Sequence, residues 1–186
     1  MVRAFVAIDV KGPELADFVG IVQKRLATLR SKVTSVDATK LHITLKFLGD
    51  VPEAALGPVK ERLEDVVRPR FSFEVRGLGV LPNERRPRVI YLAVRKGARE
   101  VAQLAAKVED ALASLGFPRE KREFRAHVTL ARIKQPWLAR DLPQIFSEFE
   151  EASAYTVEIE DLRLKKSLLT PSGPIYSDLH VVRLAD

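Results

Sequence analysis

The tetrapeptide HITL at residues 42–45 returns as HVTL at residues 127–130, and the two histidines lie 85 positions apart. The same offset relates Lys11-Gly12 to Lys96-Gly97, and the apolar stretch FVAI at residues 5–8 to IYLA at residues 90–93. A repeat that keeps one offset over several anchors indicates two copies of one structural unit. We therefore expect a single bilobal domain over residues 1–186, with an internal repeat of roughly 1–84 and 85–186.

The segments between these anchors have matching hydrophobic patterns. Apolar residues recur at intervals of three and four after Pro13 and after Gly97, which is typical of amphipathic helices. A second, shorter helical pattern follows each histidine segment, and an alternating strand pattern follows that, at residues 71–75 and 155–159. This order favours an α+β fold of two pseudo-symmetric lobes, each a small antiparallel or mixed sheet backed by two helices, with an active-site cleft between them. We expect the polar stretch LPNERRPR at residues 81–88 to connect the lobes.

Composition excludes several classes of protein. The chain has 31 Lys and Arg against 25 Asp and Glu, a net charge of +6, and 46% hydrophobic residues, which is typical of a globular protein. The modest positive charge has two interpretations: the Lys and Arg side chains solvate the surface, or they give a weak preference for a polyanion. Because there is no cysteine, disulfides, thiolate metal sites and a cysteine nucleophile are excluded. No segment resembles a membrane span or a signal peptide, so we expect a cytoplasmic protein without a membrane partner. A monomer is a separate expectation. One asparagine, one methionine and many charged residues are typical of a thermophilic source.

Each histidine segment is predicted to be a half-buried strand with one polar face. Side chains alternate along a strand, so His42 and Thr44 share one face while Ile43 and Leu45 share the other. The same alternation places His127 beside Thr129. Lys46 alternates onto the face of Thr44, where its ammonium would offset phosphate charge; an exposed strand-end lysine is the alternative.

Two facing imidazoles and two hydroxyls suit displacement at phosphorus. Near neutral pH one of two histidines is neutral while the other is protonated, which provides a base and an acid together. Threonine hydroxyls donate hydrogen bonds to phosphate oxygens. In-line displacement needs a proton removed from the attacking oxygen and a proton given to the leaving oxygen. The pair of motifs therefore indicates phosphodiester chemistry.

Metal binding is the rival use of paired histidines. A zinc site needs three or four ligands with supporting carboxylates, and no such spacing surrounds either motif, so we expect no metal and no other cofactor. A single His-x-Thr sequence is common on ordinary strands. Only its repetition at equivalent positions makes the two motifs informative. The third histidine, His180, lacks the pattern and is expected to be a strand-end residue with a hydrogen-bonded ring.

The two motifs resemble those of the 2H phosphoesterases, named for paired His-x-Thr-x motifs. Within this family the chain is most similar to the RNA 2′,3′-cyclic phosphodiesterases, also called 2′-5′ RNA ligases. The resemblance covers RAFVAID at residues 3–9, KLHITLKFLG at 40–49, FRAHVTLAR at 124–132 and SGPIYSDL at 172–179. Ala126 departs from the pattern, since the family typically has proline before the second histidine.

The resemblance implies a role for each residue that matches the motifs. His127 would take a proton from the attacking water, and His42 would protonate the departing ribose O3′, leaving a 2′-phosphate. Thr44 and Thr129 would bind phosphate oxygens, and Arg132 would contact the terminal nucleotide, by stacking on the base as well as by charge. The near-symmetry of the motifs gives no independent reason to prefer this order of acid and base.

Other aromatic and basic residues have two interpretations each. Tyr176 and Trp137 would stack on bases or lie in the core, with the core position favoured for Tyr176. Arg85, Arg86 and Arg88 would follow an RNA backbone or keep a connecting segment soluble, and we favour the second interpretation.

Three functions are compatible with these observations. The first is metal-independent opening of RNA 2′,3′-cyclic phosphate ends, with reversible 2′-5′ ligation of tRNA halves implied by the resemblance. The second is hydrolysis of another small phosphodiester, such as a 2′-5′ oligonucleotide or an ADP-ribose cyclic phosphate. The third is a module that binds RNA ends without turnover.

Overall fold

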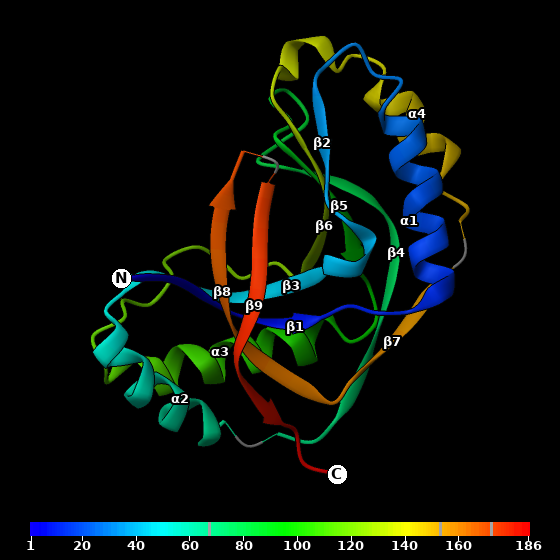
Figure 1. Cartoon of the computed structure of the whole chain (residues 1–186). Helices are drawn as coiled ribbons and strands as arrows, with labels where there is room; N and C mark the ends of the chain where they lie inside the picture. The colour runs from blue at the N-terminus through cyan, green and yellow to red at the C-terminus, as the bar shows by residue number, and fades with distance from the viewer. Residues whose placement is uncertain (67, 153, 172) are drawn as a thin grey trace.

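Two antiparallel sheets and four helices make up the computed structural model, which describes residues 1–66, 68–152, 154–171 and 173–186 (Figure 1). Sheet A has the strand order β3-β1-β8-β9, and sheet B has the order β2-β6-β5-β4-β7. The strands are β1 (Val2–Asp9), β2 (Val33–Ser35), β3 (His42–Val51), β4 (Phe71–Leu81), β5 (Val89–Val94), β6 (His127–Ile133), β7 (Tyr155–Ile159), β8 (Asp161–Thr170) and β9 (Gly173–Arg183). The helices are α1 (Pro13–Leu26), α2 (Leu56–Glu64), α3 (Ala98–Ala113) and α4 (Leu142–Glu148), with short 3-10 turns η1 (Ala38–Lys40), η2 (Glu53–Ala55) and η3 (Pro136–Leu138).

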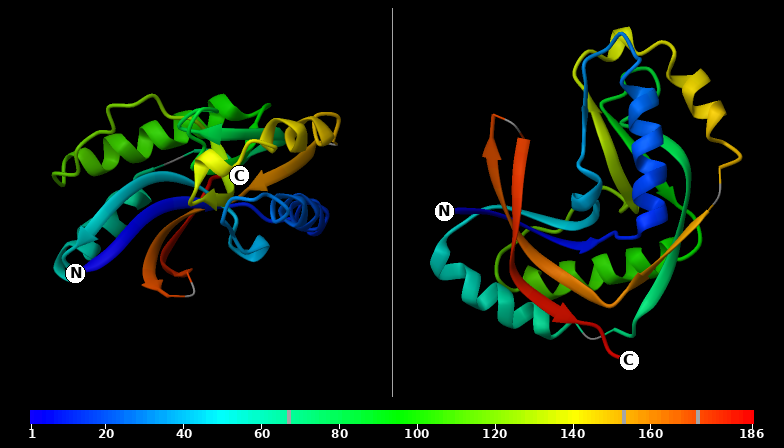
Figure 2. Two further views of the ribbon diagram at one scale, coloured as in Figure 1. Left: turned by 90° about the horizontal axis from the view of Figure 1, so that it is seen from above. Right: turned by 45° about the vertical axis from the view of Figure 1, so that its right-hand side comes forward.

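The two sheets exchange strands between the two halves of the chain. Strands β8 and β9, from the C-terminal end, extend the sheet of β1 and β3, whereas β2 and β4, from the first half, lie in sheet B. Each lobe is a sheet with two helices, as the sequence predicted, but neither lobe is one copy of the repeat. Figure 2 shows the hairpin of β8 and β9, in orange and red, extending away from the rest of the chain.

The helices cross over in the same way. Helix α1 contacts β6 and α4 on sheet B, where Arg25 of α1 pairs with Glu148 of α4 at 2.6 Å. Helix α3 contacts β3 and α2 on sheet A. Figure 1 shows α1 beside α4 and α3 beside α2. Each copy of the repeat therefore contributes a helix to the opposite lobe.

The loop at residues 82–88 does not connect the lobes, and that prediction was wrong. It joins β4 to β5, which are neighbours in sheet B. The side-chain oxygen of Asn83 accepts the backbone N–H groups of Arg85 and Arg86, each at 3.1 Å. The loop is therefore a hydrogen-bonded turn within one sheet.

The repeat offset is 84 along the first strand of each copy and 85 along the histidine strands. Asp9 pairs with His42 between β1 and β3, and Ala93 pairs with His127 between β5 and β6. The alignment of residues 5–8 with residues 90–93 was thus one residue out of register. A shift of one residue exchanges the faces of a strand, so only the pairing in the structure identifies which side chains of β1 and β5 lie beside the histidines.

One continuous core fixes the lobes relative to each other. Buried residues of both sheets and all four helices belong to a single hydrophobic cluster among the described residues. The apolar faces of α1 and α3, predicted from their spacing, are fully buried at Val19, Val22, Leu104 and Val108. Among the described residues, no helix has the length and apolar character needed to cross a bilayer. The polar faces of the histidine strands are left to form the site.

Candidate active site

A β-bulge in β3 decides which side chains accompany His42. His42 and Thr44 are half-buried on one face, and Ile43 is buried on the other, as predicted. Ala7 pairs with Thr44 but Val6 pairs with Lys46, so Leu45 is an extra residue. Beyond the bulge the alternation is inverted, and Phe47 returns to the histidine face with 73% of its surface exposed.

The same bulge occurs in β6. Tyr91 pairs with Thr129 and Ile90 pairs with Ala131, which leaves Leu130 as the extra residue. The carbonyl oxygen of Leu130 accepts the backbone N–H of Val36 at 2.8 Å and the side-chain amide of Gln23 at 3.0 Å. Without the bulge, Arg132 would lie on the face opposite Thr129, because it is three positions further along the strand. With it, Arg132 joins the histidine face.

Lys46 does not lie on the phosphate face, and its predicted placement was wrong. The bulge turns it into the protein, where its side chain is 4% exposed. Its ammonium donates to Glu109 Oε2 of α3 and to the carbonyl of Pro118, both at 2.7 Å. It is neither a phosphate ligand nor an exposed strand-end lysine, but half of a buried ion pair between β3 and α3. Strict alternation failed because one residue was added to the strand.

Both catalytic candidates hold their rings through the same backbone contact. Nδ1 of His42 lies 2.8 Å from the carbonyl oxygen of Lys40, and Nδ1 of His127 lies 2.7 Å from that of Arg125. A carbonyl only accepts hydrogen bonds, so Nδ1 carries a proton in each ring. The other nitrogen, Nε2, is therefore the one that exchanges protons in both histidines.

His42 lies among aromatic rings and opposing charges. Its ring centroid is 5.3 Å from those of Phe5 and Tyr176. Burial lowers the pKa of His42, and the charges of Lys165 and Arg132 lower it further, against the opposing effects of the Lys40 carbonyl and Asp9. This shift favours the neutral form of His42 in the free protein.

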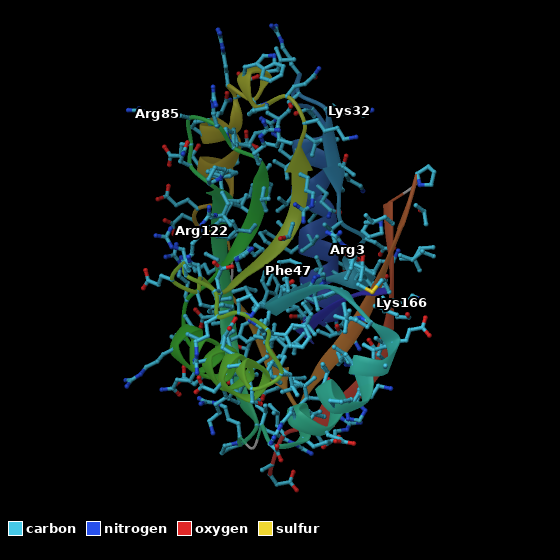
Figure 3. All side chains as sticks on the ribbon, turned by 90° about the vertical axis from the view of Figure 1, so that its left-hand side faces the viewer. Arg3, Lys32, Phe47, Arg85, Arg122 and Lys166 are labelled. Carbon is cyan, nitrogen blue, oxygen red and sulfur yellow. The ribbon has the colours of Figure 1, made fainter. Side chains whose placement is uncertain are left out.

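The charge of Arg132 connects the two histidine strands. Strands β3 and β6 approach each other although they belong to different sheets. Arg132 of sheet B is close enough to sheet A for its charge to act on His42 and Tyr176. Burial raises the pKa of Tyr176, and Arg132 partly offsets that effect. Figure 3 shows Phe47 near the middle of the molecule, with Arg85 at the upper left and Lys166 at the right-hand side.

The structure also locates Tyr176, Trp137 and His180, which the sequence analysis discussed. Tyr176 is half-buried against His42 and not in the core, contrary to the interpretation that we favoured. Trp137 is 64% exposed in η3, so its core interpretation was also wrong. His180 Nε2 lies 2.5 Å from Glu64 Oε1, which agrees with a hydrogen-bonded strand-end histidine outside the site.

Sequence reasoning missed two aromatic residues beside the motifs. Phe47 precedes Arg132 by the repeat offset of 85, so a search at equivalent positions finds it. Tyr91 lies beside Thr129, with its ring 5.3 Å from that of His127. A Cβ at Gly79 would lie 2.5 Å from the ring of Tyr91, so glycine is required for the tyrosine to lie across that strand.

No metal site was found in the part of the chain that the structure describes. No three His, Asp or Glu side chains come together there in a group that would hold an ion. That the reaction needs no metal stays a prediction, which an activity assay in the presence of a chelator tests.

The fold and the paired histidine faces define a phosphoesterase with two His-x-Thr motifs. The model of the family described as LigT like Phosphoesterase matches twice in succession, at residues 8–91 and 92–176. The chain belongs to this family of LigT-like phosphoesterases, as the resemblance of its motifs predicted.

Named relatives and a solved structure agree with this assignment. A protein of Aeropyrum pernix named RNA 2′,3′-cyclic phosphodiesterase is 42% identical over 171 residues, which cover 87% of this chain and 96% of that protein. A protein of the same name from Archaeoglobus fulgidus is 39% identical over 96% of this chain and 98% of its own. The crystal structure of TT0787 from Thermus thermophilus superposes with a TM-score of 0.78 at 25% identity, covering 97% of both chains. The predicted α+β class is confirmed.

Proposed function

We propose that this protein hydrolyses 2′,3′-cyclic phosphate ends of RNA to 2′-phosphates. The observation that carries the proposal is the matched orientation of the two histidines, since both fix Nδ1 on a backbone carbonyl and leave Nε2 for proton exchange. The names of the relatives from Aeropyrum pernix and Archaeoglobus fulgidus support the choice of substrate.

In the proposed reaction the two rings act on opposite sides of the phosphorus. Nε2 of His127 removes a proton from water as the water oxygen bonds to phosphorus. The bond from phosphorus to O3′ breaks, and O3′ takes the proton of His42 Nε2. The product carries a 2′-phosphate and a free 3′-hydroxyl. Solvent then returns both histidines to their starting states.

His42 must gain a proton before it serves as the acid. Burial holds its pKa below the ordinary value in the free protein. The negative charge of a bound cyclic phosphate favours the imidazolium and raises that pKa. Substrate binding therefore prepares the acid that the step consumes.

The remaining residues of the histidine faces bind the substrate. The hydroxyls of Thr44 and Thr129 donate to the phosphate oxygens. Phe47 and Arg132 occupy equivalent positions after the two bulges, and we assign both to the terminal base, the phenyl ring by stacking and the guanidinium by stacking and charge. Tyr176 supports the ring of His42 by edge contact at 5.3 Å.

The test is hydrolysis of an RNA with a cyclic phosphate end in the presence of a strong chelator. We expect turnover to a 2′-phosphate, identified by phosphorus NMR. A 3′-phosphate product, or activity that the chelator abolishes, would contradict the mechanism. Binding of the RNA end without turnover would indicate the binding module, and hydrolysis confined to other phosphodiesters would indicate the second alternative.

We also propose a ligase activity for the same site. With an RNA 5′-hydroxyl in place of water, the same two groups form a 2′-5′ linkage: His127 takes the proton of the 5′-hydroxyl as its oxygen bonds to phosphorus, and O3′ leaves with the proton of His42. For this activity, tRNA halves are the substrates to try first. The monomeric state stays a prediction, to be measured by size-exclusion chromatography with light scattering, as does the cytoplasmic location.

A further inference from the structure

A charged pocket opens beside His42 on sheet A. Its volume is about 270 Å³, and His42 and Tyr176 form part of its wall. Four cationic side chains line it, against two carboxylates, Asp9 and Asp178. The cations are Lys11, Lys40, Arg163 and Lys165. The proposed reaction uses His42 of this wall but none of these four cations.

The floor of the pocket is a fixed network of ion pairs. Lys165 Nζ lies 2.8 Å from Asp9 Oδ1 and 2.7 Å from Asp178 Oδ1. Arg163 reaches Asp178 at 2.6 Å and Asp161 at 2.8 Å. Both carboxylates that line the pocket are therefore neutralised by partners that are themselves mostly buried, with Lys165 9% exposed. A ligand would meet a rigid, charge-balanced floor.

The rim differs because its cations are loosely held. The side chain of Lys11 is 64% exposed and lies 3.4 Å from Asp9. The side chain of Lys40 is 42% exposed and lies 4.0 Å from Asp37. Exposed pairs at such distances contribute little stability, so these ammonium groups are available to an incoming anion. The excess positive charge of the pocket thus lies at its mouth.

The position of the pocket relative to the reacting groups indicates which anion it takes. On a ribose, O3′ lies on the side of C4′ and the 5′ phosphodiester, whereas O2′ lies on the side of C1′ and the base. His42 is the proposed donor to O3′, and the pocket adjoins His42. Along β3, Phe47 lies beyond Thr44 at the other end of the histidine face, on the side assigned to the base.

We propose that this pocket is a second phosphate subsite, which binds the phosphodiester on the 5′ side of the terminal nucleotide through Lys11 and Lys40. This inference rests on the proposed function and sharpens it: the enzyme prefers the end of an RNA chain to an isolated nucleoside cyclic phosphate. A free inorganic phosphate has the same chemistry as the phosphodiester, so the experiment must distinguish the two.

The test compares three substrates with the same terminal base: a nucleoside 2′,3′-cyclic phosphate, its 5′-phosphorylated form, and a dinucleotide with a cyclic end. We expect kcat/KM to rise about tenfold when the 5′ phosphate is present, the size of one or two charge-assisted contacts. In Lys11→Ala/Lys40→Ala the preference should fall about tenfold, and the salt dependence for the dinucleotide should become shallower. Lys24→Ala, which removes one exposed cation from α1, a helix that contacts β6 of sheet B, is the control and should keep the preference.

The same experiment distinguishes failure of the proposed function from failure of the phosphate subsite. Absence of turnover with all three substrates overturns the proposed function. Turnover without a preference, or a preference that survives in Lys11→Ala/Lys40→Ala, overturns the subsite alone. Activation of the bare nucleoside substrate by added inorganic phosphate, lost in the double variant, would assign the pocket to a free anion and overturn its assignment to RNA.

Discussion

Strands β3 and β6 are built alike but lie in different surroundings. Each presents a histidine and a threonine, each has a bulge one residue later, and each histidine binds the carbonyl two residues before it. The neighbours differ: β1 places Asp9 opposite His42, whereas β5 places Ala93 opposite His127. The repeated backbone thus orients the two rings in the same way, and the surrounding side chains give them different environments.

The inequality extends along both faces. His42 packs against Phe5 and Tyr176 beside the charged pocket, while His127 has Tyr91 as its aromatic neighbour. The positions after the bulges carry Phe47 in one strand and Arg132 in the other. An asymmetric substrate, with a base on one side of its ribose and a phosphodiester on the other, requires such a difference.

Removing either imidazole should have the largest effect. We expect His42→Ala and His127→Ala each to lower kcat about 10³-fold, within the range for a lost general acid or base. The double variant should fall little further, because the two groups act in one step. Single-turnover rates measure this, with circular dichroism as the control for folding. A single variant within tenfold of the unmodified protein would contradict the shared step.

Substitution of the residues that follow the two bulges should have the second largest effect on activity. Phe47→Ala and Arg132→Ala are each expected to lower kcat/KM about 10- to 100-fold, the range for lost base stacking. Phe47→Trp should restore activity, whereas Arg132→Lys should not, because only guanidinium is planar. Initial rates at low substrate concentration measure both. Equal activity of Phe47→Ala and the unmodified enzyme would remove Phe47 from the site.

Lys46 and Ala131 occupy equivalent inward positions, and the difference between them concerns stability. Lys46→Ala leaves Glu109 without its partner, so we expect a loss of about 3 kcal/mol of unfolding free energy. Calorimetry should show a lower Tm, while kcat of the folded fraction is retained. Lys46→Met/Glu109→Leu removes both charges and should recover most of the loss. A fall in kcat with unchanged stability would return Lys46 to the phosphate face.

The shift of the His42 pKa from the ordinary histidine value is the smallest effect that we expect. Burial lowers it, so in the free protein we expect His42 to titrate below the ordinary value of 6.5. Because the folded state favours the neutral ring, its contribution to stability is present above pH 6.5 and is lost as the pH falls through the lowered pKa. NMR titration of the ring protons measures this, with His42→Gln for assignment, and bound inorganic phosphate should raise the value. Titration of free His42 above 6.5 would show that burial does not dominate its pKa.

Much of the site was predictable because it rests on local pattern. The faces of His42, Thr44, His127 and Thr129 follow from strand alternation, and the helices follow from apolar spacing. Lys46 was misplaced because a bulge adds one residue without any signal in composition. Tyr176 was assigned to the core because a strand pattern does not show which face meets another sheet.

The sequence by itself determined that two copies of a strand and helix unit would each present an imidazole beside a hydroxyl, since periodicity depends only on neighbouring residues. Only the tertiary structure decided that strands and helices cross between lobes, that bulges bring Phe47 and Arg132 onto the histidine faces, and that Asp9 lies opposite His42. Pairing between distant strands is set by packing of the whole core, and the register of one strand against another is not encoded in either strand alone.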